Sequence, residues 1–436
     1  MKLPDFITPQ LVVSFVTIAL MVHIVLVCVA YLVMAERKVS AYIQDRIGPN
    51  RVGFDFGLPW LAPLKGCLGL GQPLADGIKF ILKEDYTPER VDKILFTLAP
   101  VIIIVPALMG FIVIPWGGVW DGTILGRQIF QGSVHVAGAH INIGFVYLLA
   151  VASLGVYGVT LGGWASNNKF SFLGGLRATA QMISYEIPMG LSLMVALLAM
   201  GTVLPDAIVR HQAHQGWLLF SQPLAALIFF IAIMAEANRA PFDNAECEQE
   251  LVGGYHTEYS SMRFALFFLA EYAHLITSSS FFVLVFLGGY QLLPFVNDPL
   301  TSPEATSIFA VLAKIGVYLG KVVGVVVFSM VIRWTIPRLR YDQIMMTGWN
   351  LVIPLALVQV VVVSFMIFMG WTGILPMLAA NVGLMVLTLI VIPVIPRSQA
   401  NRRLPLYGSR FSPVEGEVVR TAPSNPVALA DSPAST

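Results

Sequence analysis

One short stretch of the chain concentrates acidic residues that could exchange protons or bind a cation. Residues 236–261 read EANRAPFDNAECEQELVGGYHTEYSS and contain six carboxylates and one arginine. Neighbouring carboxylates cannot all ionise independently, so they can share and relay protons. Clustered oxygens also suit a hard cation, although no D-x-D-x-D-G loop is present, and a solvated surface loop is the commonest explanation of such a cluster. If this stretch is helical, Asp243, Glu246 and Glu250 share one face and Glu248 points elsewhere, because residues three and four apart are neighbours.

Three carboxylates, one of which begins that stretch, lie within or at the end of long apolar runs, where a charge costs about 2.5–3.5 kcal/mol to insert into a membrane. Glu186 lies two residues before Pro188, Glu236 ends one run, and Glu271 lies well inside another, with His274 three residues later. Burial favours the protonated form of a carboxyl group, so such residues can exchange protons near neutral pH. Two interpretations fit: these residues line a wet proton path, or they pair with polar groups of neighbouring helices.

The residues that follow the first apolar run could bind a polar headgroup. The segment AERKVSAYIQDRIGPNRVG holds Glu36, Arg37, Asp45 and Arg46 ahead of a turn at residues 48–50. Juxtamembrane arginines bind lipid headgroups. An alternating set of charges beside a turn can equally line the mouth of a pocket for an amphipathic molecule, and composition favours neither interpretation.

The elements that must position these residues are membrane helices. Of the 436 residues, 57% are hydrophobic and only 12% are charged, whereas soluble chains carry roughly 25% charged residues. The sequence therefore predicts an all-α polytopic membrane protein, and its near-zero net charge indicates no nucleic-acid-binding surface. The three cysteines are far apart and indicate neither a disulfide framework nor a metal site. Nine runs have about the length needed to cross a bilayer: 11–34, 94–114, 142–164, 180–203, 217–236, 262–288, 308–332, 351–371 and 374–395.

The basic residues predict how the helices are oriented. Segment 36–93 carries nine Lys and Arg residues, whereas 115–141 carries only Arg127 and 289–307 carries none. The loops alternate in this way along the chain, so the positive-inside rule places the N-terminus outside and the C-terminus in the cytoplasm.

Two segments outside the spans have their own character. PLADGIKFILKED has apolar residues at helical spacing and predicts a short amphipathic helix, either on the membrane surface or packed against the bundle. Residues 396–436 are rich in Pro, Ser and Ala and predict a disordered tail. We therefore expect a membrane domain over 1–395 and a cytoplasmic tail over 396–436.

Five motifs together resemble one known family. They are AERKVSAYIQDRIGPNRVG, QPLADGIKFILKED, GGWASNNKFSFLGGLRATAQMISYE, the acidic stretch continued to FLAEY, and IPRLRYDQIMMTGWN. In this order, over about residues 30–370, they are similar to the H subunit of bacterial NADH:quinone oxidoreductase, which is respiratory complex I, and to its mitochondrial counterpart, subunit 1.

The resemblance implies a tilted bundle of eight helices, plus a ninth here, at the heel of the membrane arm. It implies that the chain lines a tunnel by which quinone enters, and that an acidic path couples quinone reduction to proton pumping. The implied tunnel residues are Glu36, Arg37, Arg46, Asp76, Arg333 and Arg338. The implied proton-path residues are Glu186, Glu236, Asp243, Glu246, Glu248, Glu250, Glu258 and Glu271.

The same resemblance implies partners and location. The chain itself would bind no flavin, cluster or metal and hold no catalytic residue, while quinone would be the substrate, and NADH, FMN and iron–sulfur clusters would belong to neighbouring subunits. Expected partners are the quinone-site and iron–sulfur subunits of the hydrophilic arm, small membrane subunits and the lipid of the bacterial cytoplasmic membrane. The alternatives are a subunit of a related hydrogenase or ferredoxin-linked complex, or a stand-alone cation or proton transporter.

The chain departs from the family pattern at four positions. Gly77, Pro188, Ala245 and Cys247 stand where the family more often has other residues. The ninth span and the tail lie outside the pattern.

Overall fold

The fold is almost entirely helical. The computed structural model describes residues 8–55, 59–60, 65–124, 127–130, 132–245, 248–295 and 298–391. Glu246, Cys247 and the expected tail over 396–436 lie outside these residues. The chain divides into one compact unit, Met1–Val386, and a second, Leu387–Thr436, of which the described part is the end of the last helix.

Eight of the described helices, some continued by a 3₁₀ or π turn, are long and apolar enough to cross a membrane. The prediction of an all-α polytopic membrane protein is therefore confirmed. The run predicted at 217–236 differs, because it divides into two short helices, α7 (Leu218–Ser221) and α8 (Pro223–Glu236). The long elements are α1 (Pro9–Ile43), α3 (Lys93–Met109) with η2 (Gly110–Val113), α4 (Gly144–Ala165), α5 (Lys169–Met200), α10 (Ser261–Phe286), α11 (Ile308–Thr335), α12 (Tyr341–Thr347) with η4 (Gly348–Val352) and α13 (Ile353–Phe368), and α14 (Ile374–Val391).

Short elements fill the connections between the long helices. The predicted amphipathic helix is α2 (Gln72–Leu82), which packs beside α1 and α10. Two pairs of two-residue strands lie between α3 and α4, with β1 (Val119–Trp120) antiparallel to β4 (Val134–His135) and β2 (Thr123–Ile124) antiparallel to β3 (Arg127–Gln128). The others are α6 (Pro205–Gln215), α9 (Glu248–Leu251) and η3 (Gly254–His256).

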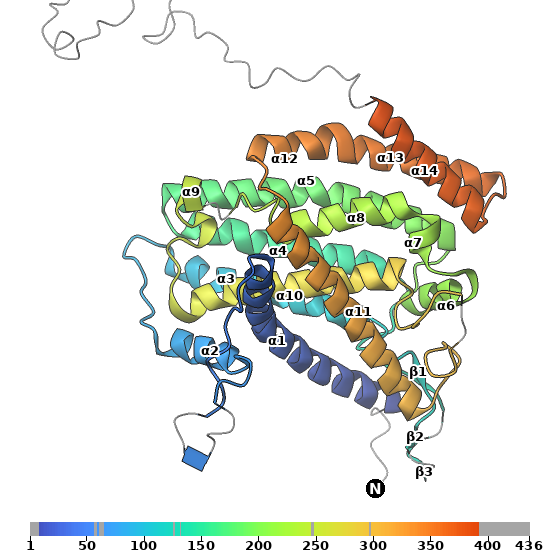
Figure 1. The fold of residues 1–436 in the computed structure, drawn as a ribbon, viewed down its shortest axis with the longest axis horizontal. Coiled ribbons are helices and arrows are strands. Elements are labelled where there is room, and N and C mark those ends of the chain that lie inside the picture. The colour runs from blue at the N-terminus through green and yellow to red at the C-terminus, as the bar shows by residue number, and fades with distance from the viewer. Residues whose placement is uncertain are drawn as a thin grey trace, which may run out of the picture. The chain divides into compact units, whose positions relative to one another are not determined.

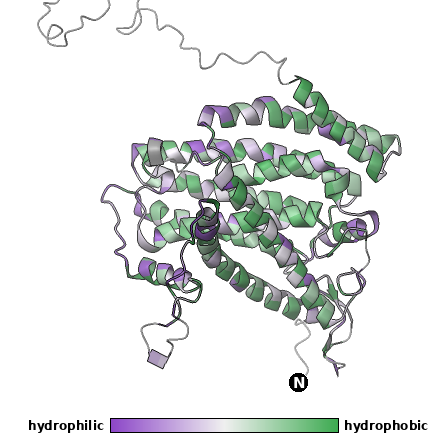
Figure 2. Cartoon of the chain, in the orientation of Figure 1, coloured by the Kyte–Doolittle hydropathy of each residue, from purple (hydrophilic) through white to green (hydrophobic). Residues whose placement is uncertain are grey.

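The core forms where the long helices meet. In Figure 1, α4, α5, α8 and α10 run side by side, and α1 and α11 cross them obliquely. One apolar cluster draws residues from all of these helices. Large apolar side chains also point outward; those of Phe15, Ile94 and Val361 are 71%, 78% and 68% exposed. Figure 2 shows the bundle helices as mostly hydrophobic, with hydrophilic residues at their ends and over the connections. Lipid is the environment that suits such a surface.

Side chains that cap the helices fix where several of them begin. The Thr8 hydroxyl accepts from the Leu11 amide at the start of α1, and Asn168 Oδ1 accepts from the Phe170 amide at the start of α5. At its other end α5 stops at Gly201, whose φ of 67° is left-handed. Pro188 lies inside α5, which continues through it.

Glycine allows α4 and α5 to approach each other closely. A Cβ atom on Gly163 would lie 2.7 Å from the Ser171 carbonyl oxygen and 3.2 Å from the Cα of Gly175. Only a residue without a side chain fits this crossing.

A buried amide network joins α14 to the bundle. Asn381, 1% exposed, receives a hydrogen bond from Gln359 and donates to the Gln222 side chain and to the Met377 carbonyl, each at 2.8 Å. Buried amides are costly unless they are paired, so these contacts favour one position of α14 against α8 and α13.

Candidate functional site

The last residues of α1 contribute a carboxylate to a buried cluster of charges. Glu36 is 6% exposed and accepts hydrogen bonds from Arg333 at the end of α11 and from the Tyr272 hydroxyl of α10. Arg239 Nη1 lies 3.6 Å from the oxygen that Tyr272 bonds. The Arg239 guanidinium also lies over the Tyr272 ring, 4.0 Å from the centroid. We call these four residues the Glu36 cluster.

Burial without a partner would be costly for each of these charges, so they stabilise one another only as a set. A cavity of about 10 Å³ adjoins the cluster and is also lined by Ser329. The phenol and the two guanidiniums around such a space can donate hydrogen bonds to an oxygen that becomes negative.

The loop after α8 brings Arg239 to this place. Gln181 of α5 is fully buried, and its amide donates to the carbonyls of Ala235 and Phe242 and to the side chain of Asn238. The backbone turns at Asn238, where φ is 47°. One side chain of α5 therefore holds both ends of this turn and sets the direction in which Arg239 points.

Glu236 and His274 pair with each other and line a second cavity. Glu236 Oε1 lies 3.4 Å from His274 Nε2. Its Oε2 is buried and makes no hydrogen bond to a described atom. The cavity, of about 30 Å³, has largely apolar walls but includes Thr277 and Ser278. It is large enough and polar enough on one side to hold water.

Two more carboxylates, Glu186 and Glu271, interact electrostatically with this pair. Tyr255 donates to Glu271 at 2.6 Å, and Ser153 of α4 donates to Glu186. Glu236 acts electrostatically on Glu186, and both Glu236 and Glu271 act on His274.

Asp243 lies between these acids and two arginines, Arg338 and Arg333, and interacts with both sides. It lies 3.6 Å from Arg338 and within electrostatic range of Glu271 and Arg333. Burial raises the pKa of the Asp243 carboxyl to about 6, against the opposing effect of Arg338. We call Glu186, Glu236, His274, Glu271 and Asp243 the buried acid row.

Several residues implied by the resemblance lie outside these two groups. Arg37 pairs with Asp76 of α2 at 2.9 Å, with the arginine side chain half exposed, and Arg46 is exposed and bonds Gln44. In the stretch that contains α9, Glu250 pairs with Arg177 at 2.6 Å and is 51% exposed.

Of the remaining acids of this region, the structure describes the side chain of Glu258. Glu258 accepts from Asn168 at 2.6 Å. Glu246 and the side chain of Glu248 lie outside the described residues. Within the described residues, the acids of 236–261 form no group that could hold a metal ion.

The sequence alone indicated no role for Tyr272, Tyr255, Ser153 or Arg177, the groups that hold the carboxylates in place. Tyr272 directly follows Glu271 in the sequence, but on a helix it points elsewhere, toward Glu36. Nothing in local spacing could have indicated that contact, because its two residues are 236 positions apart.

The fold and the site define a multi-pass, all-α membrane protein whose interior carries ionisable residues. A family model described as NADH dehydrogenase matches residues 16–364. The H subunit of NADH-quinone oxidoreductase from Flavobacterium johnsoniae is 42% identical over 354 residues, which cover 81% of this chain and 94% of the relative. The H subunit from Syntrophotalea carbinolica is 43% identical, covering 83% and 98%, and the second H subunit from Geobacter sulfurreducens is 45% identical, covering 80% and 95%.

The chain belongs to the NADH dehydrogenase family, as an H subunit of NADH-quinone oxidoreductase. It is a membrane subunit of an oxidoreductase complex, so the enzymatic activity belongs to the assembly. The family match ends at residue 364, before α14 begins at Ile374.

Proposed function

We propose that this chain forms part of the quinone-binding tunnel of NADH:quinone oxidoreductase and of the acidic path that couples quinone reduction to proton pumping. The observation that carries the proposal is the Glu36 cluster, where helices and loops far apart in sequence supply donors and an acid to one buried point. The proposed tunnel residues are Glu36, Arg37, Arg46, Asp76, Arg333 and Arg338.

The cluster has the chemistry that quinone reduction needs. A quinone oxygen gains negative charge when it is reduced, and Arg and Tyr donors held in a low-dielectric site favour that charge strongly. The Arg37–Asp76 pair lies at the surface between α1 and α2, where an entering headgroup would meet it before reaching Glu36.

The buried acid row supports the proton-path part of the proposal. Its members interact in sequence from Glu186 to Asp243, and Asp243 pairs with Arg338, one of the proposed tunnel residues. A charge that appears near the arginines changes the proton affinity of Asp243, and the change passes along coupled groups. The full proposed path is Glu186, Glu236, Asp243, Glu246, Glu248, Glu250, Glu258 and Glu271.

Membership of the family favours this function over a stand-alone transporter. In the proposed assembly, NADH, FMN and iron–sulfur clusters are held by partner subunits of the hydrophilic arm, small membrane subunits lie next to this chain, and quinone is the shared substrate. The proposed location is the bacterial cytoplasmic membrane, with the N-terminus outside and the C-terminus in the cytoplasm.

The two parts of the proposal can be tested separately in membranes that contain the assembled complex. Glu36→Gln removes the charge that holds two arginines, so we expect at least a tenfold loss of quinone-dependent NADH oxidation, with normal electron transfer to an artificial acceptor that needs no quinone site. The combined variant Glu236→Gln with Glu271→Gln should lower the number of protons pumped per quinone reduced.

Glu304→Gln is the matched control, because Glu304 is exposed in the loop before α11 and belongs to neither group. Normal quinone kinetics in Glu36→Gln would remove the tunnel assignment. Normal pumping in the double variant would remove the path assignment and leave the tunnel standing.

A further inference from the structure

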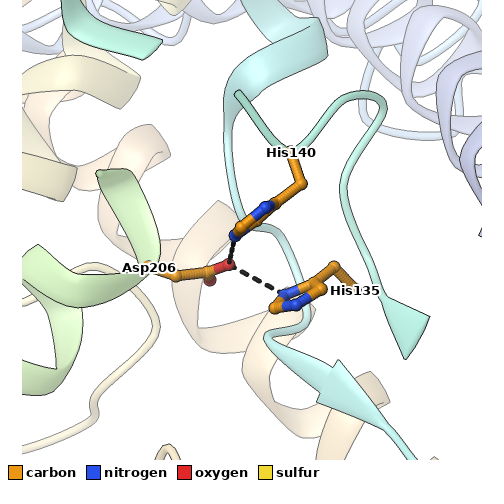
Figure 3. Close-up of side chains that lie close together, drawn as sticks. All are labelled: His135, His140 and Asp206. Atoms are coloured by element: carbon orange, nitrogen blue, oxygen red, sulfur yellow. Dashed lines mark hydrogen bonds and ion pairs between the residues drawn. The ribbon is translucent and has the colours of Figure 1, made fainter. Parts of the chain in front are cut away.

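Two histidines and one aspartate converge at the end of the molecule opposite the Glu36 cluster. His135 lies in β4, His140 lies in the loop before α4, and Asp206 lies in the first turn of α6 (Figure 3). His135 Nδ1 is 3.0 Å and His140 Nε2 is 3.4 Å from the same oxygen, Asp206 Oδ2. One suitable ligand atom from each residue lies within 4.8 Å of the others.

The segments that carry these residues are held in place by contacts that do not involve the three side chains themselves. The Gln10 side chain, near the start of α1, donates to the carbonyl of His135 and accepts from its amide. The Ala139 amide donates to the Ile112 carbonyl in η2, which fixes the loop beside His140. Pro205 occupies the first turn of α6, next to Asp206.

Burial at the three residues suits an ion that enters from outside. The Asp206 side chain is 7% exposed, whereas those of His135 and His140 are 31% and 33% exposed. The carboxylate therefore lies at the bottom of the site, and the two imidazoles form its open side.

The distances suit a small tetrahedral ion. Zn²⁺ binds imidazole nitrogen and carboxylate oxygen at about 2.0–2.1 Å, which places neighbouring ligand atoms about 3.3 Å apart. The two nitrogen–oxygen distances lie on either side of that value. The rings are now stacked, with centroids 4.1 Å apart, so binding requires each exposed ring to tilt until its lone pair points at the ion.

Hydrogen bonding alone is the competing explanation, because one carboxylate oxygen can accept from both rings. A nearby cation, Lys314, also acts electrostatically on Asp206 and works against a second positive ion. The combination of two imidazoles and a carboxylate nevertheless matches the ligand set of many zinc sites, with a fourth position open to water.

We propose that His135, His140 and Asp206 form a Zn²⁺ site on the face of the bundle away from the Glu36 cluster. The ion joins β4 and the following loop to α6, and Gln10 extends that connection to the start of α1. Gln10 and Glu36 are 26 residues apart on one helix, which is about 39 Å at 1.5 Å per residue. The site is thus separate from the proposed quinone and proton path, and its role is to tie the connections of that face together.

The proposal can be tested with the purified full chain in lipid nanodiscs, with Co²⁺ as a spectroscopic probe and Zn²⁺ as competitor. We expect one Co²⁺ per chain with the absorption bands of a tetrahedral ion, and displacement by one Zn²⁺. Loss of a supporting contact already weakens zinc sites 10–100-fold, so His140→Ala and Asp206→Asn should weaken binding by at least about 100-fold. X-ray absorption of the zinc form should give two imidazole nitrogens at about 2.0–2.1 Å.

His214→Ala is the control, because His214 is exposed on the same helix as Asp206. This variant should bind Co²⁺ and Zn²⁺ as tightly as the wild type does. Asp206→Asn keeps the shape and a hydrogen-bond acceptor, so it reports on the ion even where an alanine variant fails to fold. Equal zinc affinity in the wild type and Asp206→Asn, or no binding in the wild type, would overturn the proposal.

Discussion

Glu36 shows how much of a buried site depends on residues that are distant in sequence. Its neighbours in the chain, Arg37 and Lys38, bond elsewhere, to Asp76 and to a backbone carbonyl. Its own partner Arg333 lies 297 positions away. The residue type and its place after an apolar run could be predicted to matter, but local spacing contains no information on which cations would surround it.

Asp243 is a member of the buried acid row that lies in a connection outside the long helices, and its pKa is raised. Burial raises its pKa from the ordinary 3.8 to about 6, although Arg338 and Arg333 oppose the shift. The folded chain therefore takes up a proton as the pH falls through about 6, while the unfolded chain does so only near the ordinary value of 3.8. The contribution of this group to the stability of the folded chain rises as the pH falls across that window.

Asp243→Asn should remove this protonation step. Infrared difference spectra between pH 7 and pH 5 should show a protonated carboxyl band in the wild type and a weaker one in the variant. Glu89→Gln, a change at an exposed acid, should leave the band intact. A band of full size in Asp243→Asn would show that another carboxyl titrates there.

At the scale of single elements, hydrophobic pattern predicted the helices well and their ends less well. The amphipathic pattern in PLADGIKFILKED, residues 73–85, predicted the helix that is observed as α2 over Gln72–Leu82. The run at 217–236 divides into α7 and α8 because Gln222 and Pro223 interrupt it: Pro223 cannot donate a helical hydrogen bond and starts α8 afresh. The turn after α8 could not be predicted, because it is held by Gln181 from another helix.

Two glycines in helices should respond in opposite ways to alanine. A Cβ atom on Gly77 meets nothing within 4 Å, so Gly77→Ala should stabilise α2 by about 0.5–1 kcal/mol through the lower entropy of the unfolded chain. Gly163→Ala places a methyl group 2.7 Å from the Ser171 carbonyl oxygen and should destabilise the fold by about 1–3 kcal/mol. Thermal unfolding of the purified chain, followed by circular dichroism, measures both. Equal effects would mean that α4 and α5 lie farther apart at their crossing.

For the whole molecule, composition and motif order were sufficient to predict the class and the family. Both depend on features repeated along hundreds of residues, such as apolar runs and five motifs in order, so an error at one position changes little. The packing of the buried acid row depends instead on a few long-range contacts. The group of His135, His140 and Asp206 could not be predicted for the same reason, since its members come from three different elements.

The orientation predicted from the basic residues can be tested by cysteine labelling. In a chain whose native cysteines are replaced by serine, we expect Ser133→Cys to react with a membrane-impermeant thiol reagent added outside intact cells stripped of their outer membrane. Glu89→Cys should react only after the membrane is opened. Both positions are exposed, so access and not burial decides the result, and the reverse pattern would invert the topology.

The amides around Asn381 have a consequence for how the chain is made. Gln222 and Gln359 are synthesised before Asn381, whose side chain pairs with both of theirs. The last helix therefore supplies the partner for two earlier amides, and a chain that stops before residue 374 leaves both without it. Although α14 lies beyond the residues that the family model matches, it thus satisfies polar groups that lie within them.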